Sequence, residues 1–416
     1  MDSIVINGGK ELRGSVLISG AKNAVLPMMA ASLLADGVTT ISNVPNLRDT
    51  RTMASLIEVT GAQVQLDYPE ISIDSSTVHT LEAPYELVKT MRASFYILGP
   101  LLGRFGKAKI SLPGGCAWGP RPVDFHLKAL EKMGASIRLE KGYVLAEAQT
   151  LRGCSIQFDF PSVGATGNIV MAAVRASGIT EIKNAAMEPE IEQLCTMLNM
   201  MGAQIEGVGT PYLTINGVKQ LSPIHISVIP DRIEAGTFLI AGALLGRVSI
   251  EKTTPTHLKA LLEKLHSSGT QVDIDKDSIT VSSPGHIKPA DLTTAVYPGF
   301  PTDLQAQWIA CMSTAGGSSV VTDTVYHDRF SHVPELNRLG ANITIENNSA
   351  FVRGVKKLKG AHVMSTDIRA SASLILGGLV AEGETTVSRV YHIDRGYEHI
   401  VNKFQSLGAD IKRIQS

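Results

Sequence analysis

The chain has 416 residues, of which 44% are hydrophobic and 19% are charged, and its formal net charge is -1 at pH 7. This length exceeds the size at which one hydrophobic core usually stops growing, so the sequence predicts two domains. A charge near zero gives no overall attraction to nucleic acid or to an anionic membrane, so any anion binding has to be local.

The N-terminal segment, MDSIVINGG, starts with an acidic residue and lacks the basic start and the apolar run of a signal peptide. The longest apolar stretch, around residues 25–35, is about half the roughly 20 residues that a membrane-spanning helix needs. We therefore expect a cytoplasmic protein without a membrane-spanning segment.

A pattern of helix end, glycine and strand recurs six times along the chain, at intervals of 67 to 73 residues. Its glycines are Gly61, Gly134, Gly202, Gly269, Gly340 and Gly408. Glycine suits the left-handed conformation that ends many helices, and the alternating apolar residues after it suit a strand. We call these glycines the glycine stops. Upstream of each glycine stop lie a short strand, an apolar helix and a second strand. The sequence thus predicts six βαβαββ units.

The apolar helices of these units predict the arrangement inside each domain. Segments such as IVMAAVRA and TFLIAGALLG are apolar around their whole circumference, so we expect them inside, with sheets packed outside. Six units divide into three and three at the turn-rich segment around Ser222 and Pro223. We predict one domain at 22–229 and a discontinuous one at 1–21 and 230–416, which the N-terminal strands complete. Two similar domains favour a ligand cleft between them.

Cys116 lies in the most unusual segment, SLPGGCAWGPRPVDFH, whose glycines and prolines exclude a regular helix. Many cysteines are merely small buried hydrophobes. On a polar loop near Arg121, however, a thiolate would be stabilised, as it is at reactive cysteines. Cys195 and Cys311 lie in apolar helical segments and are expected to be structural. The chain has no CxxC pair, which argues against a zinc or redox motif.

Basic residues recur beside small residues at the predicted turns from strand to helix. Helix N-termini already favour anions through their free N–H groups and the helix dipole. A cation at such a turn therefore indicates a carboxylate or phosphate site, although a solvated surface charge is the alternative for any single residue. The residues of this set are Lys22, Arg92, Arg232, Arg369 and Arg395.

Asp303 follows two prolines and opens an apolar helix in YPGFPTDLQAQW. Its carboxylate could cap that helix, or it could act as a general base if burial raises its pKa; the sequence leaves both open. The motifs GxxxxGK[ST], GxGxxG and HExxH are missing from the sequence, so nucleotide triphosphatase, dinucleotide-binding and zinc-peptidase functions lose their main support.

Seven motifs, in order and along essentially the whole chain, resemble the UDP-N-acetylglucosamine 1-carboxyvinyltransferases of the enolpyruvyl transferase family. They are SGAKNA, KTMRAS, PGGCAWGPRPVD, FPTD, DRFSHVPEL, TDIRAS and HIDRGYE. The resemblance implies an α/β fold of two inside-out barrels, each of three βαβαββ repeats, with an active-site cleft between them. It also implies that the enolpyruvyl group of phosphoenolpyruvate moves to the 3'-hydroxyl of UDP-N-acetylglucosamine, as the first committed step of peptidoglycan synthesis.

The resemblance also assigns roles to the residues that match the family's motifs. The implied catalytic residues are Cys116, Asp303, Lys22 and Arg395. Phosphoenolpyruvate would be bound by Lys22, Asn23, Cys116, Arg121 and Arg395. UDP-N-acetylglucosamine would be bound by Arg92, Arg121, Pro122, Val123, Asp124, Phe125, Ser162, Val163, Asp303 and Val325. Further active-site positions are Arg369, Asp367 and Arg329. Phe160 and Pro161 depart from the family, since they stand where many members have a lysine.

In the implied mechanism Cys116 protonates the methylene carbon of phosphoenolpyruvate, with which it can also form a covalent adduct, and Asp303 takes the proton of the sugar hydroxyl. The implied partners are these two small molecules, with no cofactor, metal, nucleic acid or membrane. Two alternatives stay open. One is 3-phosphoshikimate 1-carboxyvinyltransferase, which shares the repeats but lacks the loop cysteine; the other is a non-catalytic sensor that binds the UDP-sugar.

Overall fold

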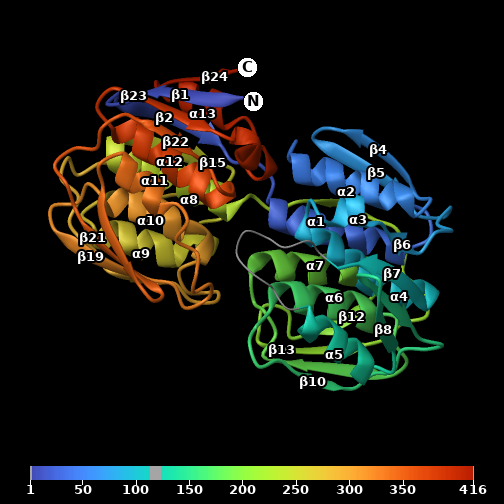
Figure 1. Ribbon diagram of the computed structural model, residues 1–416. Helices are drawn as coiled ribbons and strands as arrows, with labels where there is room; N and C mark the ends of the chain where they lie inside the picture. Colours follow the sequence, from blue (N-terminus) through green and yellow to red (C-terminus); the bar gives the residue numbers. More distant parts are fainter. Residues whose placement is uncertain (1, 113–122, 416) are drawn as a thin grey trace. The chain divides into compact units, whose positions relative to one another are not determined.

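The computed structural model describes residues 2–112 and 123–415 (Figure 1). The chain forms two compact units, each of which is described by itself. The central unit is Gly20–Ile229, and the terminal unit combines the residues up to Ser19 with those from Pro230 onward. The chain therefore passes from one unit to the other twice, after Ser19 and after Ile229.

Three four-stranded sheets of one pattern build the central unit. In each sheet the first two strands are parallel and the remaining pairs are antiparallel, as in the first sheet. The sheets, in strand order, are β14 (His225–Ser227), β3 (Val38–Ser42), β5 (Glu70–Asp74) and β4 (Gln63–Asp67); β6 (Glu82–Ala83), β7 (Lys107–Ser111), β9 (Tyr143–Glu147) and β8 (Ser136–Glu140); and β10 (Ser155–Gln157), β11 (Ile179–Lys183), β13 (Tyr212–Asn216) and β12 (Gln204–Glu206).

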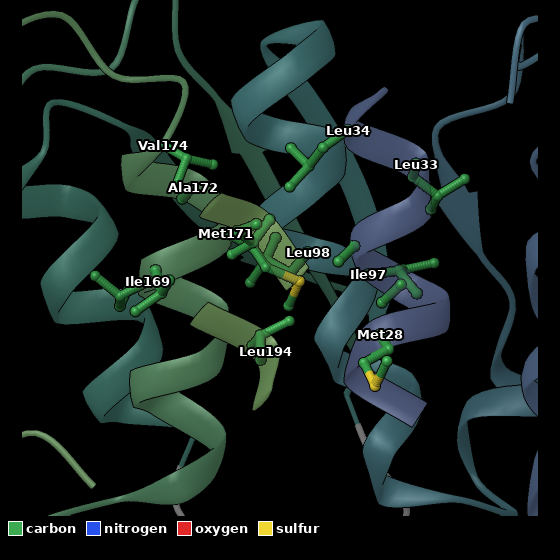
Figure 2. Packing of buried hydrophobic residues seen from close by; sticks show 14 of the residues in the cluster. Met28, Leu33, Leu34, Ile97, Leu98, Ile169, Met171, Ala172, Val174 and Leu194 are labelled. Atoms are coloured by element: carbon green, nitrogen blue, oxygen red, sulfur yellow. The ribbon is translucent and has the colours of Figure 1, made fainter. Parts of the chain in front are cut away.

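The core of the central unit is made by apolar helices that are buried on nearly all sides. Figure 2 shows Met28, Leu98 and Met171 in this core, and all three side chains are fully buried. Each such burial contributes about 1.5–3 kcal/mol to stability. The buried elements are α1 (Lys22–Ala31), η1 (Ser32–Leu34), η2 (Arg92–Ile97), α4 (Leu98–Phe105) and α6 (Val163–Ala173), and the others are α2 (Arg48–Val59), α3 (Tyr85–Val88), α5 (Asp124–Lys132) and α7 (Pro189–Met200).

The terminal unit repeats this plan with three further sheets. They are β2 (Leu12–Leu17), β15 (Gly246–Glu251), β17 (Ser278–Ser282) and β16 (Gln271–Ile274); β18 (Leu292–Thr293), β19 (Ser318–Thr322), β21 (Ser349–Arg353) and β20 (Asn342–Glu346); and β22 (His362–Met364), β23 (Glu384–Ser388), β1 (Ser3–Asn7) and β24 (Asp410–Ile414). The apolar helices are α8 (Arg232–Leu245), α10 (Gln305–Met312) and α12 (Ile368–Val380), and the remaining ones are η3 (Pro255–Leu258), α9 (Lys259–Ser267), η4 (Thr302–Leu304), α11 (Val333–Arg338), η5 (Val390–Arg395) and α13 (Ile400–Ser406).

Near each of the two chain crossings, a strand lies in one unit and the helix that follows it lies in the other unit. Strand β2 precedes α1 in the chain but pairs in parallel with β15 of the terminal unit. Strand β14 precedes α8 but pairs in parallel with β3 of the central unit. Strand β1 completes the last sheet by pairing antiparallel with β23 and β24. The first sheet of each unit therefore takes its parallel edge strand from a segment that lies next to a crossing and far away in sequence.

The predicted glycine stops are confirmed. All six have a positive φ, between 89° and 105°, in the region that side chains rarely adopt. Each one follows a helix of its repeat and precedes a strand. In the described part of the chain, no helix combines the length and the apolar character that crossing a membrane requires.

Candidate active site

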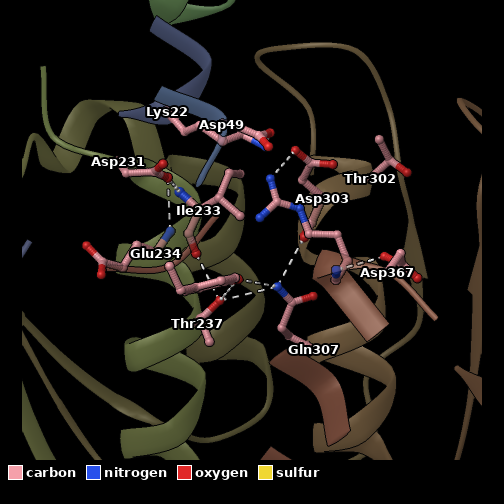
Figure 3. Close-up of polar contacts among 12 residues, drawn as sticks. Lys22, Asp49, Asp231, Ile233, Glu234, Thr237, Thr302, Asp303, Gln307 and Asp367 are labelled. Carbon is pink, nitrogen blue, oxygen red and sulfur yellow. Dashed lines mark hydrogen bonds and ion pairs between the residues drawn. The ribbon is translucent and has the colours of Figure 1, made fainter. Parts of the chain in front are cut away.

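In the terminal unit, Asp303 lies between two arginines. Its Oδ1 is 2.7 Å from Nη2 of Arg329, and its Oδ2 is 2.7 Å from Nη2 of Arg369. The two arginine side chains are only 10% and 8% exposed, whereas the aspartate is 24% exposed. The carboxylate is therefore the most exposed of the three side chains. Figure 3 shows Asp303 with its neighbours Thr302 and Gln307.

The structure excludes the cap interpretation of Asp303 and the raised pKa expected for a base. The cap position of its helical turn is Pro301, and no side chain caps that turn, so Asp303 is not an N-cap. Burial alone would raise the pKa of Asp303, but the guanidinium groups of Arg369 and Arg329 outweigh burial and hold this pKa well below its ordinary value. The expectation of a raised pKa is therefore wrong. The role of Asp303 as a base stays a prediction.

The terminal unit carries three further predicted residues. Asp367 caps α12, and its Oδ1 accepts hydrogen bonds from the backbone N–H groups of Arg369 (2.8 Å) and Ala370 (3.2 Å). Arg395 is the last residue of η5, which packs against α12. Val325 follows β19 and is partly exposed. The terminal unit thus brings Asp303, Arg329 and Arg369 into direct contact and places Asp367 at the start of the same helix as Arg369.

In the central unit, the predicted residues lie where helices begin. Lys22 is the first residue of α1, and its Nζ is 3.6 Å from Oδ2 of Asp49 on α2. Ser162 caps α6 by accepting a hydrogen bond from the backbone N–H of Ala165 (3.3 Å). The other predicted residues at such starts are Asn23 on α1, Arg92 at the beginning of η2, Val123, Asp124 and Phe125 at the beginning of α5, and Val163 on α6. Free N–H groups at helix starts favour anionic ligands.

A buried amide ties these helix starts together. The Nδ2 of Asn168 on α6 donates to the carbonyl of Phe95 in η2 (2.9 Å), and its Oδ1 accepts from the N–H of Gly99 on α4 (2.7 Å). The same Nδ2 is 3.0 Å from Nδ1 of His126 on α5. Burial, with the nearby charge of Arg92, lowers the pKa of His126 to about 3, so its ring is neutral at pH 7. Asn168 therefore links η2, α4, α5 and α6.

Three of the predicted site residues, Cys116, Arg121 and Pro122, lie outside the described residues, so their roles stay predictions. Cys195 and Cys311 are buried thiols. Burial raises the pKa of Cys195 and of Cys311 to about 12, with Glu192 adding to the effect at Cys195. The prediction that these two are structural is confirmed, because a thiol with such a pKa is protonated at pH 7.

Sequence reasoning missed the polar residues that hold the site in place. Asn168 could have been noticed as the one amide in the apolar segment NIVMAAV, since a buried amide requires partners. Gln307, fully buried on α10, donates to the backbone carbonyl of Asp303 (3.1 Å) and to the hydroxyl of Tyr397 (3.1 Å). Asp49 and Asp323 carry no local signal of this kind.

Comparisons with known proteins agree on one family. A family model described as EPSP synthase (3-phosphoshikimate 1-carboxyvinyltransferase) matches residues 6–404. The chain is 53% identical over 415 residues to the UDP-N-acetylglucosamine 1-carboxyvinyltransferase of Desulfosudis oleivorans, with 100% of both chains covered. It is 55% identical to the protein of the same name from Chloroherpeton thalassium, with 99% of this chain and 97% of the relative covered.

Solved structures give the same answer for the fold. The crystal structure of the enolpyruvyl transferase NikO from Streptomyces tendae has a TM-score of 0.91 and 27% identity, and covers 100% of this chain and 99% of that chain. EPSP synthase from Acinetobacter baumannii, at 18% identity and a TM-score of 0.78 with 100% of both chains covered, shares the fold. The expected α/β fold of the enolpyruvyl transferases is thereby confirmed. The chain belongs to the enolpyruvyl transferase family, within the group of UDP-N-acetylglucosamine 1-carboxyvinyltransferases.

Proposed function

We propose that the protein transfers the enolpyruvyl group of phosphoenolpyruvate to the 3'-hydroxyl of UDP-N-acetylglucosamine and releases phosphate. The observation that carries this proposal is the full-length identity of 53% and 55% to proteins named for that reaction. The alternative acceptor, shikimate 3-phosphate, has weaker support, because the solved EPSP synthases are only 18% identical.

The charges of the described residues suit these substrates. Phosphoenolpyruvate carries a phosphate and a carboxylate in a small volume, so several cations have to act on it together. The central unit supplies Lys22 and Arg92 at helix starts. The terminal unit supplies Arg329 and Arg369, whose charges are compensated by Asp303. An entering anion would share these guanidinium groups and thereby release Asp303 for its role as a base.

In the proposed reaction, the Cys116 thiol donates a proton to the methylene carbon of phosphoenolpyruvate, which leaves cationic character at the neighbouring carbon. The 3'-oxygen of the sugar bonds to that carbon while Asp303 takes the hydroxyl proton, and a tetrahedral intermediate forms. The carbon–oxygen bond to phosphate then breaks, the new methyl group loses a proton to the Cys116 thiolate, and an enol ether remains. Addition of the Cys116 sulfur to the same cationic carbon would give a covalent adduct.

The proposed product indicates the pathway and the compartment in which the protein acts. We infer that the protein acts in peptidoglycan synthesis in the cytoplasm, and hence in cell shape and cell division. Nucleotide sugars are made and used inside the cell, which supports this location. Neither nucleic acid nor a membrane is needed for the reaction.

Phosphate release tests the choice of acceptor. With phosphoenolpyruvate present, we expect UDP-N-acetylglucosamine to start phosphate release and shikimate 3-phosphate to leave the rate at background. Release with shikimate 3-phosphate alone would favour the other transferase. A non-catalytic sensor would bind the UDP-sugar in calorimetry without releasing phosphate with either acceptor.

The epoxide antibiotic fosfomycin should modify the proposed acid. We expect the Cys116 sulfur to open the epoxide ring and form a thioether, because an activated thiolate is a strong nucleophile. Intact-protein mass spectrometry after incubation with UDP-N-acetylglucosamine should show one added drug molecule, located on Cys116 by peptide mapping. The Cys116→Ser variant should gain none. An unmodified Cys116 after prolonged incubation would refute the prediction.

A further inference from the structure

Asp323 is a fully buried carboxylate directly after β19. Its Oδ1 accepts hydrogen bonds from the N–H groups of Val325 (2.9 Å) and Tyr326 (2.8 Å) and from the hydroxyl of Thr294 (2.8 Å). Its Oδ2 accepts from the hydroxyl of Thr302 (2.6 Å). Burying a carboxylate is costly unless donors surround it, and here four donors from three segments do so. The carboxylate therefore stabilises this one arrangement of the three segments.

Through Thr302, Asp323 reaches the Asp303 cluster. The Thr302 hydroxyl has a single proton, and it donates that proton to Asp323. Its lone pairs are thereby left for Nη1 of Arg329, which donates to Thr302 at 3.1 Å. The other terminal nitrogen of Arg329 forms the ion pair with Asp303. Asp323 thus fixes the direction of the Thr302 hydroxyl, which in turn fixes Arg329 beside Asp303.

On its other side, Asp323 shapes the turn that carries Val325. The two N–H groups of this turn point at one carboxylate oxygen. The backbone of Asp323 is held as well, since its N–H donates to the carbonyl of Asn348 (2.8 Å) and its carbonyl accepts from Nδ2 of Asn348 (3.1 Å). One buried side chain therefore connects the segment of Asp303 with the segment of Val325.

We propose that Asp323 is a positioning residue for the acceptor sugar, acting through Thr302 and Arg329 on Asp303 and through the backbone turn on Val325. The proposal rests on the proposed function, in which Asp303 and Val325 bind UDP-N-acetylglucosamine. Asp323 itself touches no reacting atom. Displacing a reacting group by about 1 Å can lower a rate by about 100-fold, so a buried link of this kind affects turnover without contact with substrate.

Isosteric variants isolate the link between Asp323 and Asp303. Thr302→Val removes the hydroxyl but keeps the shape, whereas Thr302→Ser keeps the hydroxyl. Asp323→Asn keeps three acceptor contacts at Oδ1 and places a donor against Thr302. We expect Thr302→Val and Asp323→Asn each to lower kcat/KM for UDP-N-acetylglucosamine by about 10- to 100-fold. KM for phosphoenolpyruvate should rise less than KM for UDP-N-acetylglucosamine, because Arg329 is one of several cations proposed to act on phosphoenolpyruvate. Thr302→Ser should stay close to wild type.

A double variant tests whether the two residues act as one unit. Both single changes break the same link. The double variant Thr302→Val with Asp323→Asn should therefore be as active as the less active of the two single variants. Ser313→Ala is the matched control, since the Ser313 hydroxyl is also fully buried in the terminal unit but donates only to the carbonyl of Ile309 (2.8 Å). It should lower the melting temperature and leave both KM values unchanged.

Several results would overturn the inference. One is wild-type kinetics in Thr302→Val, and another is an equal loss of activity in Thr302→Ser and Thr302→Val. A third is a loss in the double variant that equals the product of the two single losses. A fourth is a rise in KM for phosphoenolpyruvate as large as the rise in KM for UDP-N-acetylglucosamine. If Asp323→Asn fails to fold, the comparison of the two Thr302 variants still decides. Failure of the proposed function is a separate result, because the wild-type protein would then release no phosphate with UDP-N-acetylglucosamine.

Discussion

Replacing Cys116 with serine is expected to lower the rate of phosphate release by about 100- to 10,000-fold, the range attributed to general acid catalysis. A serine hydroxyl is a far weaker acid than a thiol, so it cannot deliver a proton to the methylene carbon at a useful rate. The measurement is kcat at saturating phosphoenolpyruvate and UDP-N-acetylglucosamine. Binding of UDP-N-acetylglucosamine should persist, because the described residues proposed to hold it are unchanged.

Cys154→Ser provides the matched control for this prediction. Cys154 is partly exposed, burial raises the pKa of its thiol, and it lies outside the motifs that resemble the family. We expect this variant to keep the wild-type rate. Normal phosphate release by Cys116→Ser would show that another group supplies the proton, and a comparable loss in Cys154→Ser would show that the assay reports general damage.

Asp303→Asn is expected to lower kcat by about 100- to 10,000-fold as well, because the asparagine amide cannot accept the proton of the 3'-hydroxyl. Steady-state kinetics and calorimetric binding of UDP-N-acetylglucosamine separate the loss of chemistry from the loss of binding. A variant that turns over at the wild-type rate would exclude Asp303 as the base.

The same substitution should change stability in a pH-dependent way. Without the carboxylate, the guanidinium groups of Arg329 and Arg369 stand close together, at a cost of about 3 kcal/mol in the free energy of unfolding. In the wild-type protein the pKa of Asp303 is lowered on folding, so its stabilisation is complete above the ordinary aspartate value of about 3.9 and is lost as the pH falls through the lower folded value.

Urea unfolding at a series of pH values measures this difference. The gap in the free energy of unfolding between wild type and Asp303→Asn should be largest at pH 7 and should narrow once the pH falls below about 4. A gap that stays constant over the whole range would contradict the ion-pair arrangement of Asp303.

The repeat architecture could be predicted from local patterns, whereas the pairing partners of β2 and β14 could not. The glycine stops and the uniformly apolar helices are short-range signals, because a helix end and a buried helix each impose a residue type nearby. The pairing of β2 with β15 and of β14 with β3 joins strands far apart in sequence. A short strand carries the same alternating pattern whichever sheet it joins.

For the site, too, the positions of the charged residues could be predicted, but their contacts could not. Lys22, Asp303 and Arg369 stand out as charged residues at predicted turns, and the structure places all three in helix-start segments. The lowered pKa of Asp303 was not predictable, since it depends on two arginines that only the tertiary fold brings to its carboxylate. Asp323 and Thr302 look like ordinary loop residues, and their importance follows from burial and hydrogen bonding alone.

The fate of labelled phosphoenolpyruvate tests the central claim most directly. The wild-type protein is incubated with UDP-N-acetylglucosamine and with phosphoenolpyruvate that carries carbon-13 in its three carbons, and the products are followed by carbon and phosphorus NMR. The proposed function predicts a labelled enol ether on the 3'-oxygen of the sugar, formed together with an equal amount of inorganic phosphate. Label that remains in phosphoenolpyruvate, or that moves to shikimate 3-phosphate when this acceptor is added instead, would contradict it.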